Sequence, residues 1–324
     1  LVQRALGELG YTPLRITGAW DDATRQALNE FKQLGGLDAE PTLDAATLAA
    51  LADALKPRAA VLAAADGIEG FLKDNPEFRQ VPLSPQEAIP VNPSWPGRRR
   101  SLAQTYNRLG GLMNVVASRL SIELPAVLAV WNVESQGHIH TPGRAMIRFE
   151  NHIFFRVWGR SREAIYDQHF RHGGRGGLPG KPWEHHQYRE RLDQPFRPVH
   201  SGNLADEYAA LNLATRLAGE SLALQCISIG GPQIMVFNHR MLGYRAPREM
   251  YDAFQADERW HVLGFFDFCR TKEAPRPGQL VQYLRQRNWQ QFAYYYNGPG
   301  AVAVYSRRLS EAYSEARQLP PPVN

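Results

Sequence analysis

The amino-acid sequence predicts a mainly helical protein, α+β in class with a minor β element, that begins with a small three-helix domain. Three observations lead to this prediction. The chain has 324 residues, about twice the usual size of one domain, and is 44% hydrophobic and 21% charged, which suits packed cores. Apolar residues recur at helical spacing along most of it. Prolines are concentrated in residues 74–100, where a helix cannot continue.

The first 55 residues contain a weak internal repeat. The octet Asp-Asp-Ala-Thr-Arg-Gln-Ala-Leu begins at Asp21, and a related octet, Asp-Ala-Ala-Thr-Leu-Ala-Ala-Leu, begins at Asp44. In each copy the leading aspartate is placed to cap the N-terminus of a helix. An earlier apolar stripe runs from Val2 until Gly10 ends it. We therefore expect a three-helix domain over residues 1–72.

The proline-rich stretch predicts a semi-rigid linker over residues 73–100, so the second domain is expected at residues 101–324. A weak alternation at Ala145–Phe149 predicts a short strand, and five glycines in His172–Lys181 predict a mobile loop. The remaining pattern predicts helices at Ser101–Leu120, Pro125–Glu134, Leu204–Cys226, Pro232–Met241, Pro247–Phe254, Glu258–Thr271, Gln279–Gln286, Gln290–Tyr296 and Val302–Arg317.

Composition argues against several classes of protein. The longest strictly apolar run, Ala59–Ala65, is far shorter than the roughly 18 residues that span a bilayer. The net charge of +5 is concentrated in Arg156–His200, but this stretch carries no recognised nucleic-acid motif, so we expect no nucleic-acid partner. Cys226 and Cys269 are too few for a disulfide scaffold, and we expect buried thiols.

Glu134 is the first candidate for a catalytic residue. It closes the expected helix Pro125–Glu134, where the negative end of the helix dipole and the apolar neighbours Val130 and Trp131 would raise its pKa. A carboxylic acid that is still protonated near neutral pH can donate a proton to a glycosidic oxygen. The competing interpretation is a solvated glutamate at a frayed helix end.

Three segments then occur in an order typical of one enzyme superfamily. They are Val133-Glu134-Ser135, residues 228–235 (Ser-Ile-Gly-Gly-Pro-Gln-Ile-Met) and residues 293–300 (Ala-Tyr-Tyr-Tyr-Asn-Gly-Pro-Gly). Together they resemble the lysozyme-like superfamily of peptidoglycan glycosidases, in which such segments line one cleft. Residues 143–154, Gly-Arg-Ala-Met-Ile-Arg-Phe-Glu-Asn-His-Ile-Phe, look more particularly like the N-acetylmuramidase family of phage endolysins and related cell-wall enzymes. The N-terminal repeat resembles the small peptidoglycan-binding domain often fused to them.

The resemblance implies a lysozyme-like domain that cleaves the β-1,4 bond between N-acetylmuramic acid and N-acetylglucosamine, with Glu134 as general acid. Residues expected to contact the glycan are Ser135, Gln233, Tyr296 and Asn297 in the cleft, and Tyr11 and Trp20 in the N-terminal domain. The alternatives are a lytic transglycosylase of the same fold and a non-catalytic peptidoglycan-binding protein.

A glycoside hydrolase also needs a second carboxylate, whereas a lytic transglycosylase can use a hydroxyl group of the sugar itself. Glu150, at the end of the expected strand, is the candidate catalytic partner of Glu134. Its competing interpretation is a structural glutamate paired with Arg144 or Arg148. Asp167 is held in reserve.

Ten histidines make a metal site worth considering, and the closest pairs are His138 with His140 and His185 with His186. No His-Glu-x-x-His motif occurs, and adjacent histidines on a helix point apart. We expect no metal and no cofactor.

The expected partner is the glycan strand of peptidoglycan, met by a monomer that does not insert into membranes. The expected place of action is the bacterial cell wall, in the periplasm. No secretory signal is visible at Leu1, which favours delivery by phage lysis or by a secretion system.

Overall fold

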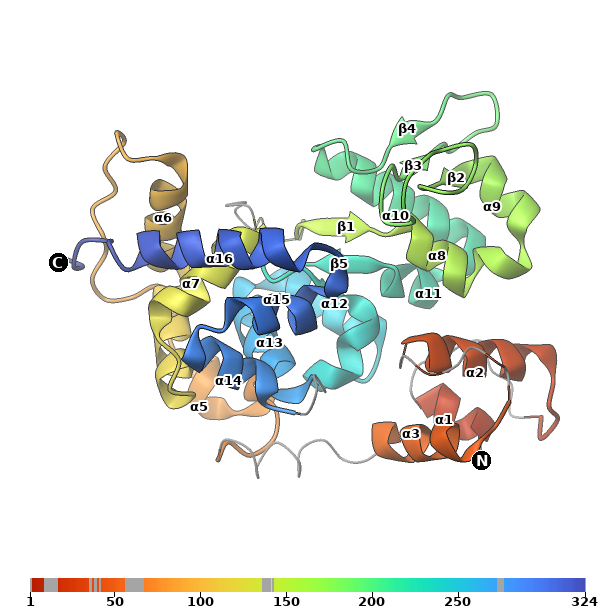
Figure 1. The fold of residues 1–324 in the computed structure, drawn as a ribbon, viewed down its shortest axis with the longest axis horizontal. Coiled ribbons are helices and arrows are strands. Elements are labelled where there is room, and N and C mark those ends of the chain that lie inside the picture. The colour runs from red at the N-terminus through yellow and green to blue at the C-terminus, as the bar shows by residue number, and fades with distance from the viewer. Residues whose placement is uncertain are drawn as a thin grey trace.

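The computed structural model describes residues 2–8, 17–34, 37, 40, 42–55, 67–135, 141, 143–272 and 277–323. These residues are mainly helical and include two three-stranded sheets, which confirms the predicted fold class (Figure 1). The α-helices are α1 (Val2–Glu8), α2 (Asp22–Leu34), α3 (Ala45–Leu55), α5 (Pro76–Gln80), α6 (Gly97–Arg119), α7 (Leu124–Ser135), α8 (Asn151–Val157), α9 (Glu163–His169), α10 (Leu204–Ala218), α11 (Glu220–Gln225), α12 (Pro247–Ala256), α13 (Glu258–Thr271), α14 (Gln279–Gln286), α15 (Trp289–Asn297) and α16 (Val302–Ala316). The short 3-10 helices are η1 (Leu72–Asp74), η2 (Gly159–Ser161), η3 (Val236–Leu242) and η4 (Pro299–Ala301).

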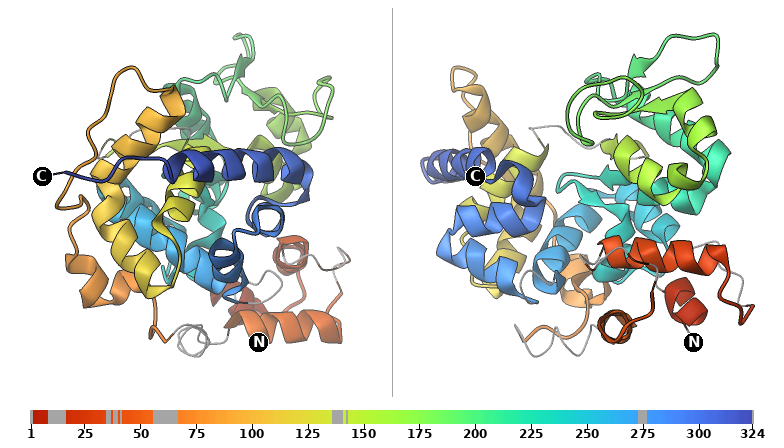
Figure 2. Two further views of the ribbon diagram at one scale, coloured as in Figure 1. Left: turned by 60° about the vertical axis from the view of Figure 1, so that its left-hand side comes forward. Right: turned by 45° about the vertical axis from the view of Figure 1, so that its right-hand side comes forward.

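The helices α1, α2 and α3 form a group with a small core of its own, centred on Leu6, Leu28 and Leu51 (Figure 2). The repeated aspartates begin two of these helices. Asp21 Oδ1 accepts the backbone N–H of Thr24 at 2.8 Å, and Asp44 Oδ1 accepts that of Thr47 at 2.6 Å. Each copy of the repeat therefore forms the same helix cap, as its sequence predicts.

A second, larger core holds the rest of the described chain together. Its central helix α7 is buried from Ala126 to Trp131, and α16 lies across it in Figure 1. Ile68 and Leu72 belong to this core, and Asp267 accepts the backbone N–H of Leu72 at 3.0 Å. The segment expected as a linker follows directly and buries Phe78 against the same core. The domain boundaries at residues 72 and 100 stay a prediction.

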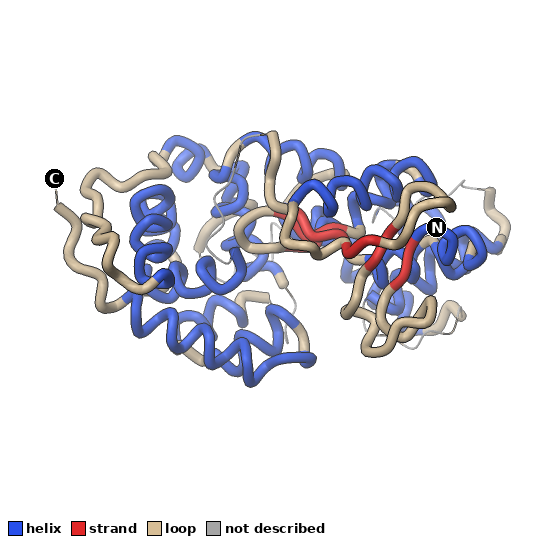
Figure 3. Tube along the Cα trace, turned by 90° about the horizontal axis from the view of Figure 1, so that it is seen from above, coloured by secondary structure: helices blue, strands red, loops and turns tan. Residues whose placement is uncertain are grey.

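Two small antiparallel sheets lie between the helices (Figure 3). The first has the order β1-β5-β6 and the second the order β2-β3-β4. Ile147 of β1 pairs with Ile229 of β5, and Ile229 also pairs with Ile234 of β6. The strands are β1 (Ile147–Phe149), β2 (Phe170–Arg171), β3 (Gln187–Tyr188), β4 (Arg197–Pro198), β5 (Ile227–Ile229) and β6 (Ile234–Met235).

Two of the expected helices are wrong. The helix expected at Pro232–Met241 is the strand β6 followed by η3, because Gln233 has a φ of 50° and closes a turn between β5 and β6. The helix expected at Leu204–Cys226 is broken at Gly219, whose φ of 88° cannot continue a helix.

Gly173, in the glycine-rich loop after β2, is required by the close approach of two backbone segments. Gly173 donates its backbone N–H to Glu184 O at 2.7 Å. A Cβ atom on Gly173 would lie 2.1 Å from Lys181 O, so only glycine permits this close approach of two backbone segments.

Both cysteines are buried thiols, in agreement with the prediction. No helix among the described residues is long and apolar enough to cross a membrane.

Candidate active site

The C-terminal end of α7 carries Glu134, and the turn between β5 and β6 packs beside it. Gly231, in this turn, lies so close to Trp131 that a Cβ atom on it would be 2.3 Å from Trp131 Cζ2. Only glycine therefore lets the turn approach α7 one helical turn before Glu134. Pro232, the next residue, accepts a hydrogen bond from the Tyr296 hydroxyl at 2.9 Å, which brings the end of α15 to the same place.

The carboxyl group of Glu134 is held by a residue of α15. Asn297 Nδ2 donates to Glu134 Oε1 at 3.0 Å. Burial raises the pKa of both Tyr296 and Tyr305, and negative charge on Glu134 acts on both in the same direction. The structure thus brings together Glu134, Tyr296 and Asn297. It adds Tyr305, which no sequence motif marked.

Burial raises the pKa of Glu134 to about 7, and the hydrogen bond from Asn297 acts in the opposite direction. The cause is the one expected from the sequence, namely loss of water around a carboxylate at the end of an apolar helix. A substantial fraction of this group is protonated at neutral pH.

Gln233 lies in the turn between β5 and β6, and Ser135 follows Glu134 at the end of α7. Gln233 Oε1 accepts from the Ser228 hydroxyl at 2.8 Å, and Gln233 Nε2 donates to Gly230 O at 2.8 Å. Its amide therefore stabilises the turn at both ends. Ser135 is buried at the end of α7. Contact of either residue with a glycan stays a prediction.

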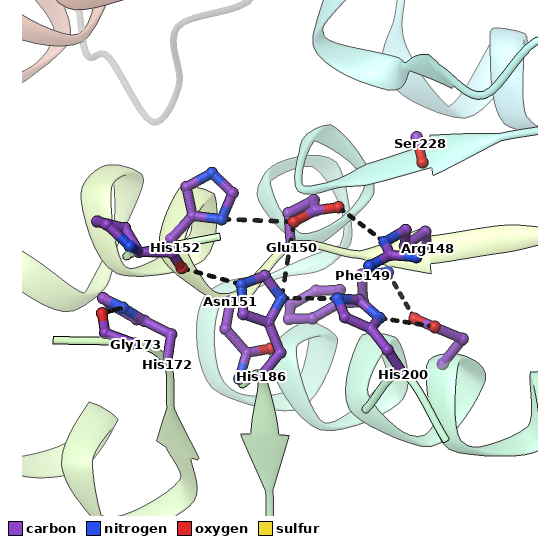
Figure 4. Close-up of polar contacts among 12 residues, drawn as sticks. Arg148, Phe149, Glu150, Asn151, His152, His172, Gly173, His186, His200 and Ser228 are labelled. Atoms are coloured by element: carbon purple, nitrogen blue, oxygen red, sulfur yellow. Dashed lines mark hydrogen bonds and ion pairs between the residues drawn. The ribbon is translucent and has the colours of Figure 1, made fainter. Parts of the chain in front are cut away.

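Glu150 follows β1 and faces cationic and imidazole groups (Figure 4). Its Oε1 lies 3.4 Å from Arg148 Nε, and its Oε2 lies 3.4 Å from His152 Nδ1 and 3.6 Å from His186 Nδ1. Burial alone would raise the pKa of Glu150, but the neighbouring imidazoles of His152, His186 and His200 outweigh it and lower this pKa well below its ordinary value. Burial lowers the pKa of His186 to about 4.

The competing interpretation of Glu150 is a structural glutamate paired with Arg144 or Arg148. The contact with Arg148 is one of these two pairings. Asp167, the reserve carboxylate, is half-exposed on α9, and its two oxygens accept from Arg175 at 2.7 and 2.9 Å.

Other residues considered from the sequence lie elsewhere. Trp20 is 39% exposed in the N-terminal group, whereas Tyr11, His138 and His140 lie outside the described residues. His185 is exposed and His186 is buried, so these neighbours point apart, as expected. His186 instead meets His200 and Glu150, a group with no signature in the sequence because its members are 14 and 36 residues apart.

Comparison with known proteins gives three findings. No protein of curated function is significantly similar in sequence to this chain. The crystal structure of the Burkholderia AP3 phage endolysin is 22% identical to it, covers 98% of this chain and 95% of its own, and has a TM-score of 0.46. Residues 1–51 match the model of a putative peptidoglycan binding domain, and residues 123–317 match that of N-acetylmuramidase. Because the second match covers more than half of the sequence, the chain belongs to the N-acetylmuramidase family, with a peptidoglycan-binding domain at its N-terminus.

Proposed function

We propose that this peptidoglycan hydrolase cleaves the β-1,4 bond between N-acetylmuramic acid and N-acetylglucosamine, with Glu134 as general acid. The observation that carries the proposal is the raised pKa of the Glu134 carboxyl group. This group is half-buried, its pKa is raised to about 7 by burial, and Asn297 donates a hydrogen bond to one of its oxygens. A general acid works best when its pKa lies near the working pH, because the protonated form is then both populated and willing to give up its proton.

In the proposed reaction, the Glu134 carboxyl group donates its proton to the oxygen that leaves as the glycosidic bond breaks. The resulting Glu134 carboxylate is stabilised by Asn297 Nδ2, which already donates to Oε1. The nearby phenols of Tyr296 and Tyr305 offer flat faces and polar tips for a sugar ring, and Tyr296 is oriented by its bond to Pro232.

The role of the second carboxylate separates two mechanisms. Both oxygens of Glu150 already face Arg148, His152 and His186, as a structural glutamate would. This observation favours the alternative of a lytic transglycosylase, in which a hydroxyl group of the sugar replaces the attacking water. If Glu150 instead activates water, Glu150→Gln lowers the rate at least about a hundredfold.

The N-terminal domain is proposed to hold the enzyme on the polymer. Tethering raises the local concentration of glycan without changing the chemistry of cleavage. We place the action of the protein at the bacterial cell wall, reached by phage lysis or by a secretion system.

Mass spectrometry of purified peptidoglycan after digestion tests the proposal. Fragments that end in reducing N-acetylmuramic acid support it, and anhydro-ended fragments support the transglycosylase. Reducing N-acetylglucosamine ends contradict the assigned bond, and no release indicates a binding protein. Glu134→Gln is the matched control, because it preserves shape and should release no fragments.

A further inference from the structure

Three side chains beside β1 converge as a carboxylate and two imidazoles. Glu150 follows β1, His186 precedes β3 and His200 follows β4. One ligand atom from each residue lies within 4.8 Å of those from the other two. Figure 4 shows the side chains of Glu150, His186 and His200 close together and directed toward one another.

The outer hydrogen bonds of the two imidazoles determine which nitrogen of each ring faces this point. His186 Nε2 lies 3.0 Å from Pro182 O, which can only accept, so Nε2 carries a hydrogen atom. His200 Nδ1 lies 2.8 Å from Glu207 Oε1, and the other oxygen of this carboxylate accepts the backbone N–H of Phe149 at 2.7 Å. Histidines that bind metals usually have such a carbonyl or carboxylate behind them.

With their outer nitrogens protonated, the two neutral rings turn their lone pairs toward each other. His186 Nδ1 and His200 Nε2 are 2.8 Å apart, and His186 Nδ1 is 3.6 Å from Glu150 Oε2. Two lone pairs and a carboxylate oxygen at these distances repel one another unless a cation lies between them. That cation is either a proton shared by the two rings or a metal ion.

We propose that Glu150, His186 and His200 bind one divalent transition-metal ion of the zinc class. Two nitrogen donors and one carboxylate oxygen suit zinc, whereas Ca²⁺ and Mg²⁺ prefer sites made of oxygen atoms. Ligand atoms around a tetrahedral zinc ion are about 3.3 Å apart, because each lies about 2.0 Å from the metal. Two of the three separations, 2.8 and 3.6 Å, need shifts of only about half an ångström, and the third, between His200 and Glu150, is within 4.8 Å.

The bound ion ties the end of β1 to the start of β3 and the end of β4 in the second sheet. Arg148 Nε lies 3.4 Å from Oε1 of Glu150, which leaves Oε2 as the oxygen that binds the metal ion. A fourth position is open to water or to His152, whose Nδ1 lies 3.4 Å from Oε2. His186 also anchors the loop that carries Trp183, a half-exposed side chain near Gly300. The site thereby fixes a loop that faces the segment after α15.

Zinc titration of the full-length protein, freed of metal with a chelator and then dialysed, tests the proposal. Calorimetry at neutral pH should show one Zn²⁺ per chain, and a hundredfold excess over Kd should raise the unfolding midpoint by roughly 5–10 °C. His200→Ala should weaken binding at least about a hundredfold. Glu207→Gln, which changes only the outer partner of His200, should weaken it about 10–100-fold.

The matched control is His185→Asn, which removes the adjacent exposed histidine. Its φ of 55° suits asparagine, and binding should be unchanged. The proposal is overturned if the wild-type protein binds no zinc, since the cation is then the shared proton. Equal binding by His200→Ala and the wild type also overturns it, because zinc then binds elsewhere. If His200→Ala fails to fold, Glu207→Gln decides in the same way.

Discussion

Replacing Glu134 with glutamine removes an acid while preserving the size of the side chain and an oxygen that can accept from Asn297. If Glu134 is the general acid, kcat/KM on peptidoglycan should fall at least about a hundredfold. In the wild type, only the protonated form donates. Its kcat/KM should therefore decline about tenfold per pH unit as the pH rises above the pKa of about 7.

The same substitution should change the pH dependence of stability. The folded-state pKa of Glu134 is raised from 4.5 to about 7, so below pH 4.5 both folded and unfolded chains are protonated and the wild type has no penalty. As the pH rises toward about 7, only the unfolded chain ionises, and the folded state loses stability. Above that pH the loss is constant, at most about 3 kcal/mol because the group is half-buried. Glutamine has no such loss.

Thermal unfolding of both proteins at about pH 4, 7 and 9 measures this difference. Relative to the wild type, Glu134→Gln should gain up to about 10 °C between the lowest and highest pH. Glu87→Gln, at an exposed position, is the control and should show no such trend. A pH-independent difference would mean that Glu134 is not held neutral by the fold. If the activity of Glu134→Gln stays within a few-fold of that of the wild type, Glu134 is not the general acid.

Three further predictions concern the surroundings of Glu134 and the N-terminal core. Asn297→Ala removes a bond that lowers the pKa of Glu134, so the alkaline limb of the pH–rate profile should move to higher pH; an unchanged limb contradicts this. Gly231→Ala places a Cβ atom against Trp131 and should cost about 1–3 kcal/mol in unfolding experiments, whereas Gly97→Ala, in open space, should not. Leu28→Ala should cost about 2–5 kcal/mol, enough to unfold the small N-terminal core, and sedimentation with insoluble peptidoglycan should be lost while cleavage of soluble fragments continues.

Helix boundaries could be predicted where a capping residue marks them. Asp257 caps α13 by accepting the backbone N–H of Arg259, and α13 begins and ends at the expected residues. The two helices of the repeat begin at their aspartates for the same reason. The bounds of α14 are also as expected, although no side chain caps its N-terminus. The strands β5 and β6 have three and two residues, too few for an alternating pattern to show. The sequence therefore predicts a helix over β6, as part of Pro232–Met241, and no element over β5.

The candidate site was only partly predictable. Glu134, Tyr296 and Asn297 belong to contiguous motifs, whereas Tyr305 reaches the site from the surface of an ordinary amphipathic helix. The cluster of Glu150, His186 and His200 was also invisible, because a ligand set shows in sequence only when two ligands share one helix or turn. Here each comes from a different segment, and only the pairing of β2, β3 and β4 brings them near β1.

The protonation state of Glu134 follows from a balance between two features of the fold. Burial of the Glu134 carboxyl group favours the neutral acid, and the hydrogen bond from Asn297 favours the anion. Burial alone would hold the proton more tightly and make Glu134 a weaker donor, whereas full exposure would leave it ionised at neutral pH. The amide of Asn297 thus offsets part of the burial and strengthens its bond as negative charge develops on Glu134. The residue that tunes the acid before the reaction also stabilises its conjugate base after proton transfer.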